Sequence, residues 1–161
     1  MLFDKEFEFK GKYATYCRFL KNDIGLFKTF REAYATSALI GFLFSIKKID
    51  NDEKVQTASI LASELAQKRT DLTYIYRLIM LLDSIPNATI LDIQNRTFKD
   101  DAESDNYPEK VTKNMATFNT YANGGIEFLY ERFKNCSEVK DTINELNDFI
   151  LEFIEDNAIC S

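Results

Sequence analysis

The chain has 161 residues, of which 45% are hydrophobic and 29% charged, as in a globular protein with a core of its own. Only five Gly and two Pro occur, which argues against a sandwich or barrel and favours long helices with short connections. The net charge of −6 is unevenly placed: residues 1–99 hold 15 Lys and Arg against 12 Asp and Glu, and residues 100–161 hold 5 against 14. This asymmetry indicates two faces that meet different partners.

The sequence predicts a cytoplasmic protein that does not enter a membrane. Acidic Asp4, Glu6 and Glu8 stand where a signal peptide would carry basic residues and then an apolar run. The most apolar run, 33–46, is shorter than the ~20 residues that cross a bilayer, and a buried helix is the better interpretation. The three cysteines are odd in number and widely spaced, which fits free thiols in a reducing cytosol.

The first third of the chain predicts an arm followed by two helices. Phe and acidic residues alternate at the start as in a strand, and we expect residues 1–9 to form an N-terminal arm. Residues 12–20 have helical spacing. A second helix is expected over about 26–46, apolar all round in its second half, as at the centre of a bundle. The polar residues 49–54 follow as a loop.

The middle of the chain predicts three more helices. Apolar residues from Ala58 to Leu65 indicate the first of them, and Thr70 is the expected cap of the next, which should end at Pro86. A short helix is expected over 90–98. Residues 99–107 break all periodicity and predict a flexible acidic loop.

Two long helices are predicted to complete the chain. Asn106 and Asn135 are placed to start them, and apolar stripes run from Val111 to Leu129 and from Val139 to Phe153. We find no internal repeat and no linker. The fold class expected is therefore all-α, a single domain over residues 1–161 built as a bundle of six or seven helices.

The absence of histidine excludes most enzymatic and metal chemistry. Without it there is no Ser-His or Cys-His nucleophile pair, no Glu-x-x-His di-iron motif and no ordinary zinc site. Carboxylates still permit a magnesium site, for which Glu127 and Glu131 are the candidate pair, whereas the acidic residues of the last helix read as a solvated face. Residues 101–112 begin like a calcium loop but lack its Gly and final Glu. We expect no enzyme, no metal and no cofactor.

A basic and aromatic segment at residues 10–31 is the candidate for binding nucleic acid or a protein partner. Positive side chains bind phosphates and aromatic rings stack on bases. The alternative is that the rings face the core and the basic residues line its solvated side, and an acidic protein partner fits equally well. The basic residues are Lys10, Lys12, Arg18, Lys21, Lys28 and Arg31.

A glycine pair inside a helical pattern is the least ordinary feature of the chain. Each glycine costs the helix ~1 kcal/mol relative to alanine. The pair could allow close packing of another helix, end one helix and start the next, or leave backbone open to a ligand. The residues proposed as structural or binding are Tyr121, Asn123, Gly124, Gly125 and Glu127.

The stretch YANGGIEFLYERF (121–133), together with FKTFREAYATSALIGFL (27–43), resembles small helical proteins associated with bacterial DNA phosphorothioation (dnd) systems. In that group an aromatic-rich helix with an apolar-Gly-Phe ending precedes a Tyr-Ala-Asn-Gly-Gly segment. The resemblance implies an accessory component of a bacterial DNA-modification or anti-phage defence module, and it implies no catalytic residue.

These observations predict a non-enzymatic helical adaptor or regulatory protein that works through protein–protein interaction. The alternative function is a nucleic-acid-binding protein that uses residues 10–31. A protein partner is expected, nucleic acid is the alternative partner, and homo-oligomerisation stays open.

Overall fold

The computed structural model describes residues 1–50, 56–101 and 107–158. Within these ranges the chain forms seven α-helices, one π-helical turn and a two-stranded sheet. In chain order the elements are β1 (Phe7–Lys10), α1 (Lys12–Arg18), the π-helical turn η1 (Phe19–Asp23), α2 (Phe30–Leu43), β2 (Thr57–Ile60), α3 (Ala62–Gln67), α4 (Arg69–Leu82), α5 (Ile90–Phe98), α6 (Tyr107–Phe133) and α7 (Val139–Ala158). The predicted helical fold is confirmed in its coarse form, and the sheet is an addition to it.

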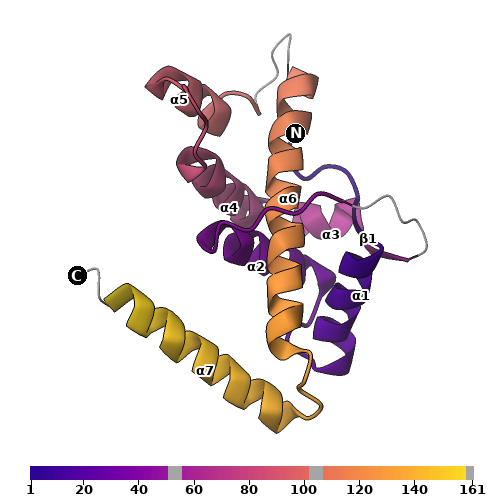
Figure 1. Cartoon of the computed structure of the whole chain (residues 1–161). Helices are drawn as coiled ribbons and strands as arrows, with labels where there is room; N and C mark the ends of the chain where they lie inside the picture. The colour runs from indigo at the N-terminus through magenta and orange to yellow at the C-terminus, as the bar shows by residue number, and fades with distance from the viewer. Residues whose placement is uncertain (51–55, 102–106, 159–161) are drawn as a thin grey trace.

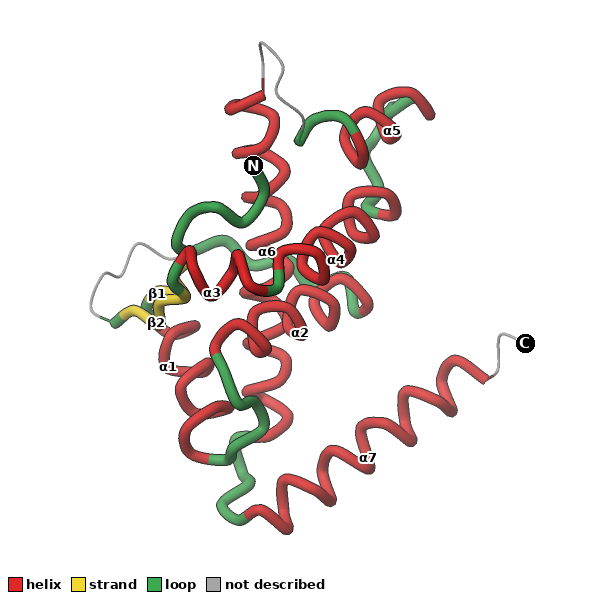
Figure 2. The backbone as a smooth tube through the Cα atoms, turned by 180° about the vertical axis from the view of Figure 1, so that it is seen from behind, coloured by secondary structure: helices red, strands yellow, loops and turns green. Residues whose placement is uncertain are grey.

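Helix α6 is the axis of the molecule. Figure 1 shows α1 and the sheet on one side of it, with α4 and α5 on the other, while α2 crosses it near its middle. Helix α7 leaves the C-terminal end of α6 and runs obliquely away from the other helices, as Figure 2 shows from behind. The molecule therefore consists of a packed body and one projecting helix.

The sheet corrects two expectations about the sequence. Strands β1 and β2 are antiparallel, with Phe7 opposite Ile60 and Phe9 opposite Ala58. Residues 7–10 are thus a strand rather than the end of an arm, and the helix expected from Ala58 begins only at Ala62. Phe9, Ala58 and Ile60 are buried, so one face of the sheet covers the core. Pairing between segments about fifty residues apart leaves no local signal, which is why the apolar spacing predicts a helix where β2 forms.

Helix ends follow the local sequence in some places and not in others. Thr29 caps α2, because its side chain accepts from the Glu32 amide while the Glu32 carboxylate accepts from the Thr29 amide. Thr70, the expected cap of α4, lies inside that helix, since α4 starts at Arg69 directly after α3. Asn135, the expected cap of α7, does not start that helix, which begins at Val139, where the Asp141 carboxylate accepts from the Ser137 and Glu138 backbone amides. The proposed cap at Asn106 lies outside the described residues.

The core lies between α2, α4, α6 and the N-terminal segment, and aromatic rings fill it. The Phe3 ring meets the rings of Tyr34, Tyr76 and Phe118 edge-on, at centroid distances of 6.4, 6.4 and 5.6 Å. Edge-to-face pairs of this kind add stability beyond the area they bury. In the described ranges, no helix is both long and apolar enough to cross a membrane.

Candidate functional site

The glycine pair of α6 lies at its crossing with α2. A Cβ atom on Gly125 would stand 1.8 Å from the Ser37 carbonyl oxygen, and one on Gly41 would stand 2.0 Å from the Tyr121 carbonyl oxygen. The two backbones are therefore in contact through residues spaced four apart on each helix. Of the three interpretations of the pair, close packing describes Gly125, because α6 continues unbroken through it.

Gly124 and Asn123 hold the segment that follows α2. A Cβ atom on Gly124 would stand 2.0 Å from the Ile46 carbonyl oxygen. The Lys48 amide donates to the Thr120 carbonyl oxygen over 2.9 Å, and the Asn123 side-chain amide donates to the Lys48 carbonyl oxygen over 3.4 Å. Residues 46–48 thus run directly along α6. Both glycines of the motif serve contacts inside the chain.

Tyr121 belongs to a buried charge cluster centred on Asp83, whose residue is 7% exposed. The Asp83 carboxylate accepts from Tyr121 Oη (2.6 Å), Lys47 Nζ (2.7 Å) and Arg96 Nη2 (2.9 Å). Burial by itself would raise the pKa of Asp83, but the hydrogen bonds from Lys47, Tyr121 and Arg96 outweigh it and hold the pKa below its ordinary value. The cluster therefore contains an ionised carboxylate that ties α4 to α5, to α6 and to the segment after α2.

This cluster was not singled out from the sequence. Arg96 is 8% exposed, and its Nε donates to Asn114 Oδ1 over 3.3 Å, so α5 is tied to α6 as well as to Asp83. The buried Arg96 Nη1 atom has no hydrogen-bond partner among the described groups. The only local sign of the cluster in the sequence is Asp83 itself, a single Asp that follows the apolar stripe of α4.

Glu127, the remaining residue proposed on α6, faces two lysines rather than a second carboxylate. Lys12 Nζ lies 2.9 Å and Lys48 Nζ 3.5 Å from its oxygens. Burial alone would raise the Glu127 pKa, but the two ammonium groups lower it below the ordinary value. Glu131, its proposed companion in a magnesium site, is paired with Lys134 at 2.6 Å. The two carboxylates thus have separate cationic partners.

The basic residues of 10–31 lie on separate elements, and most have partners within the chain. Lys10 pairs with Asp50 at 3.5 Å and Lys12 with Glu127. Arg18 donates to the Gln56 side chain and to the Thr57 carbonyl oxygen. Lys21 donates to the Asn22 side chain and lies over the Phe30 ring. Arg31 donates to the Glu64 carbonyl oxygen. Lys28 is exposed in the loop before α2.

The aromatic rings of the same segment pack inside the protein. Tyr13 is buried, and the Tyr16 ring stacks on Tyr130 with a centroid distance of 3.9 Å. Phe19 meets Tyr130 edge-on at 5.4 Å. Phe27 and Phe30 are partly buried against the core. The rings are therefore engaged with other side chains, as the core interpretation of the segment expects.

Helix α7 carries an apolar face that is largely in contact with solvent. One edge of that face touches the body, where the Phe153 ring approaches Phe44 at 6.3 Å and the Phe149 ring approaches Phe128 at 5.9 Å. Arg132 fastens the neighbouring edge through Glu145 and Glu152, both at 2.5 Å. The other edge is exposed, and we call it the α7 apolar face: Val139, Ile143, Leu146, Ile150 and Ile154, which are 36–72% exposed.

Among the described residues, no group of three or more His, Cys, Asp or Glu side chains could hold a metal ion. The Cys17 thiol is buried, and burial raises its pKa to about 12, so it is a poor nucleophile. Neither a protein-family description, nor a curated protein, nor a solved structure matches the chain.

Proposed function

We propose that this protein is a non-enzymatic helical adaptor or regulatory protein that binds another protein through the α7 apolar face. The observation that carries the proposal is the exposure of large side chains along a regular helix: Val139 is 72% exposed, Ile143 53% and Ile150 47%. These residues recur at spacings of three and four and form one continuous stripe. A contiguous apolar stripe in contact with water is typical of a surface that a partner covers.

The charge of α7 supports a partner with a basic rim around its binding groove. Residues 139–158 contain one Lys against six Asp and Glu, a net charge of −5. Two α7 helices laid side by side would therefore repel each other. An apolar groove with Lys or Arg side chains on its rim fits this helix in both respects, and binding of this kind uses positions i, i+3, i+4 and i+7 as anchors.

The biological setting that we propose is a bacterial DNA-modification or anti-phage defence system, in which the protein would act in the cytoplasm as an accessory component. The support for this setting is the resemblance of residues 27–43 and 121–133 to proteins associated with DNA phosphorothioation. The partner would then be another protein of the same system.

Photo-crosslinking from α7 tests the proposal in the source cells. A photoreactive amino acid placed at Ile143 should yield one dominant crosslinked protein, because this side chain would lie inside the interface. Ile150→Glu should abolish the crosslink, since a buried carboxylate facing an apolar groove is strongly unfavourable. Mass spectrometry of the product identifies the partner.

Asn144→Glu is the matched control, because Asn144 is exposed, lies about 120° around the helix from Ile150, and gains the same charge. It should leave the crosslink intact. Equal loss with both variants, or recovery of the wild-type chain alone as a monomer, would count against an adaptor role. A crosslink to a second copy would replace the partner class proposed above.

A further inference from the structure

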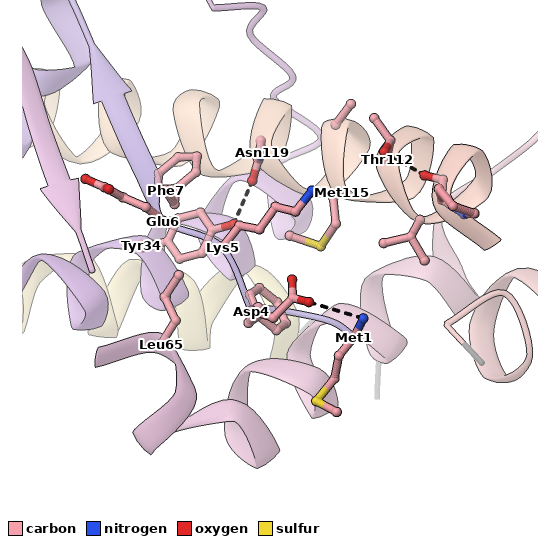
Figure 3. A pocket seen from close by; sticks show the side chains of 14 residues that line it. Met1, Asp4, Lys5, Glu6, Phe7, Tyr34, Leu65, Thr112, Met115 and Asn119 are labelled. Carbon is pink, nitrogen blue, oxygen red and sulfur yellow. Dashed lines mark hydrogen bonds and ion pairs between the residues drawn. The ribbon is translucent and has the colours of Figure 1, made fainter. Parts of the chain in front are cut away.

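A second candidate site is a pocket of about 590 Å³ between the N-terminal segment and the first half of α6. This volume is within the usual range for sites that bind small molecules. Figure 3 shows the N-terminal segment along one side of the pocket and α6 along the other, with Leu65 of α3 at the edge. It shares no residue with the α7 apolar face.

The interior of the pocket is apolar. Side chains from four separate segments contribute to it, and they leave space between them rather than interdigitating. The apolar lining consists of Phe3, Phe7, Tyr34, Leu65, Val111 and Met115. A lining of this kind takes up an aliphatic or aromatic body from water through the hydrophobic effect.

Phe3 holds the N-terminal wall of the pocket in an unusual backbone conformation. Its φ is 55°, in the left-handed region that bulky residues rarely adopt. The conformation persists because the ring is 4% exposed and packs on Tyr34, Tyr76 and Phe118. Such strain is concentrated at ligand clamps and switch regions. Burial of this ring fixes the course of residues 3–7, and with it the opening between them and α6.

The polar side chains of the pocket come from both of its walls: Asp4, Lys5 and Glu6 from the N-terminal segment, and Thr112 and Asn119 from α6. Tyr34 Oη donates to Asn119 Oδ1 over 2.6 Å, which orients the Asn119 amide and leaves its NH₂ group free to donate. Lys5 lines the same pocket as Asn119, and in Figure 3 the Glu6 carboxylate points away from Asn119. Asp4 is already paired with the Met1 ammonium group at 3.4 Å. The available donors are therefore one ammonium and one amide group, and both favour an anionic oxygen.

We propose that this pocket binds an anionic amphiphile, a molecule with an apolar chain that ends in a carboxylate. The chain lies against Phe3, Val111 and Met115, and the carboxylate pairs with the Lys5 ammonium group and accepts from the Asn119 amide. The charge-assisted bond to Lys5 supplies the discrimination against neutral molecules of the same length.

Isothermal titration of the full chain with decanoate, and separately with decan-1-ol, tests this assignment. Decanoate should bind with one-to-one stoichiometry and more tightly than the alcohol. Lys5→Gln should weaken decanoate about tenfold and leave the alcohol unchanged, as expected for the loss of one charge-assisted bond. Lys5→Arg should restore most of the affinity.

Ala116→Trp fills the opening from an exposed position of α6 that lines the pocket, and it should abolish binding of both probes. Lys113→Gln is the matched control, since Lys113 is exposed on the same helix and does not line the pocket. Binding that survives Ala116→Trp, equal weakening by both lysine changes, or no heat with wild-type protein would overturn the proposal. Binding abolished by Ile150→Glu instead would place the probe on the α7 apolar face and overturn it as well.

Discussion

Helices α6 and α7 are neighbours in the chain, but the middle of α6 is buried in the body whereas α7 is exposed along most of its length. Both are long, with 27 and 20 residues. Six consecutive residues of α6, 121–126, are buried, whereas Thr142 alone is buried among residues 139–157 of α7. The difference lies in side-chain size at the contact: α6 presents glycine to α2, whereas α7 presents the rings of Phe149 and Phe153 to Phe128 of α6 and to Phe44 after α2.

The comparison teaches that an apolar stripe does not by itself make a helix part of the core. The α2–α6 contact requires backbone approach at Gly41 and Gly125, which large residues would prevent. On α7 the body reaches only one edge of the stripe, through Phe44 and Phe128, and the rest stays exposed. Helix α6, whose backbone packs closely on α2, stabilises the fold. Helix α7, which packs along one edge only, keeps an apolar surface that a partner can bind.

The largest effect is expected at the α2–α6 contact. Gly125→Ala should reduce the free energy of unfolding by about 3 kcal/mol, because its Cβ would overlap the Ser37 carbonyl oxygen and force the helices apart. Urea denaturation followed by circular dichroism measures the loss. Lys113→Ala adds the same residue at an exposed position of α6 and should change stability little. Equal stability of the two variants would contradict backbone contact at the crossing.

The Asp83 cluster should give the next largest effect, and a pH-dependent one. Asp83→Asn should cost about 2 kcal/mol at neutral pH, because it leaves Arg96 buried without a counter-charge. The pKa of Asp83 in the folded protein is below its unfolded value, so its stabilisation is present above about pH 4 and is lost as the pH falls through the folded pKa.

The free energies of unfolding of wild type and Asp83→Asn should therefore converge on acidification below about pH 4. Denaturation curves from neutral to strongly acidic pH test this. Asp92→Asn is the comparison on α5, where the carboxylate is exposed and binds only its own Thr89 cap. A constant difference between wild type and Asp83→Asn at all pH values would mean that the cluster is not ionised as described.

The attachment of α7 should be weaker than either of these contacts. Arg132→Gln removes the ion pairs to Glu145 and Glu152, and it should speed amide hydrogen exchange in α7 several-fold without changing exchange in α6. Because Glu152 is exposed and Glu145 partly exposed, salt should screen the ion pairs and the effect should shrink at high salt. Lys134→Gln, which removes an ion pair within the corner between the helices, is the control. Equal exchange in α6 and α7 of the wild-type protein would contradict the contrast between them.

The smallest effect is expected on the α7 apolar face itself. Ile150→Ser should change the free energy of unfolding by less than about 0.5 kcal/mol, because the side chain is already half exposed and its truncation opens no cavity. Ile79→Ser in α4, where the side chain is fully buried, should cost several times more. A large loss at Ile150 would mean that α7 packs onto the body in solution.

The sequence by itself determined most of the helices and the apolar face of each, because helical spacing of apolar residues is a local signal, but it did not determine that the face of α7 stays exposed or that residues 57–60 form a strand. The sequence also shows the glycine pair within a helical pattern and the widely spaced cysteines. The absence of histidine excludes most nucleophile and metal sites. Only the tertiary structure determined which side chains from distant segments are in contact. The pairing of Phe9 with Ala58, the convergence of Lys47, Arg96 and Tyr121 on Asp83, and the pocket beside Asn119 join segments far apart in sequence. Contacts of this kind depend on how whole helices cross, and no short stretch of sequence encodes that geometry.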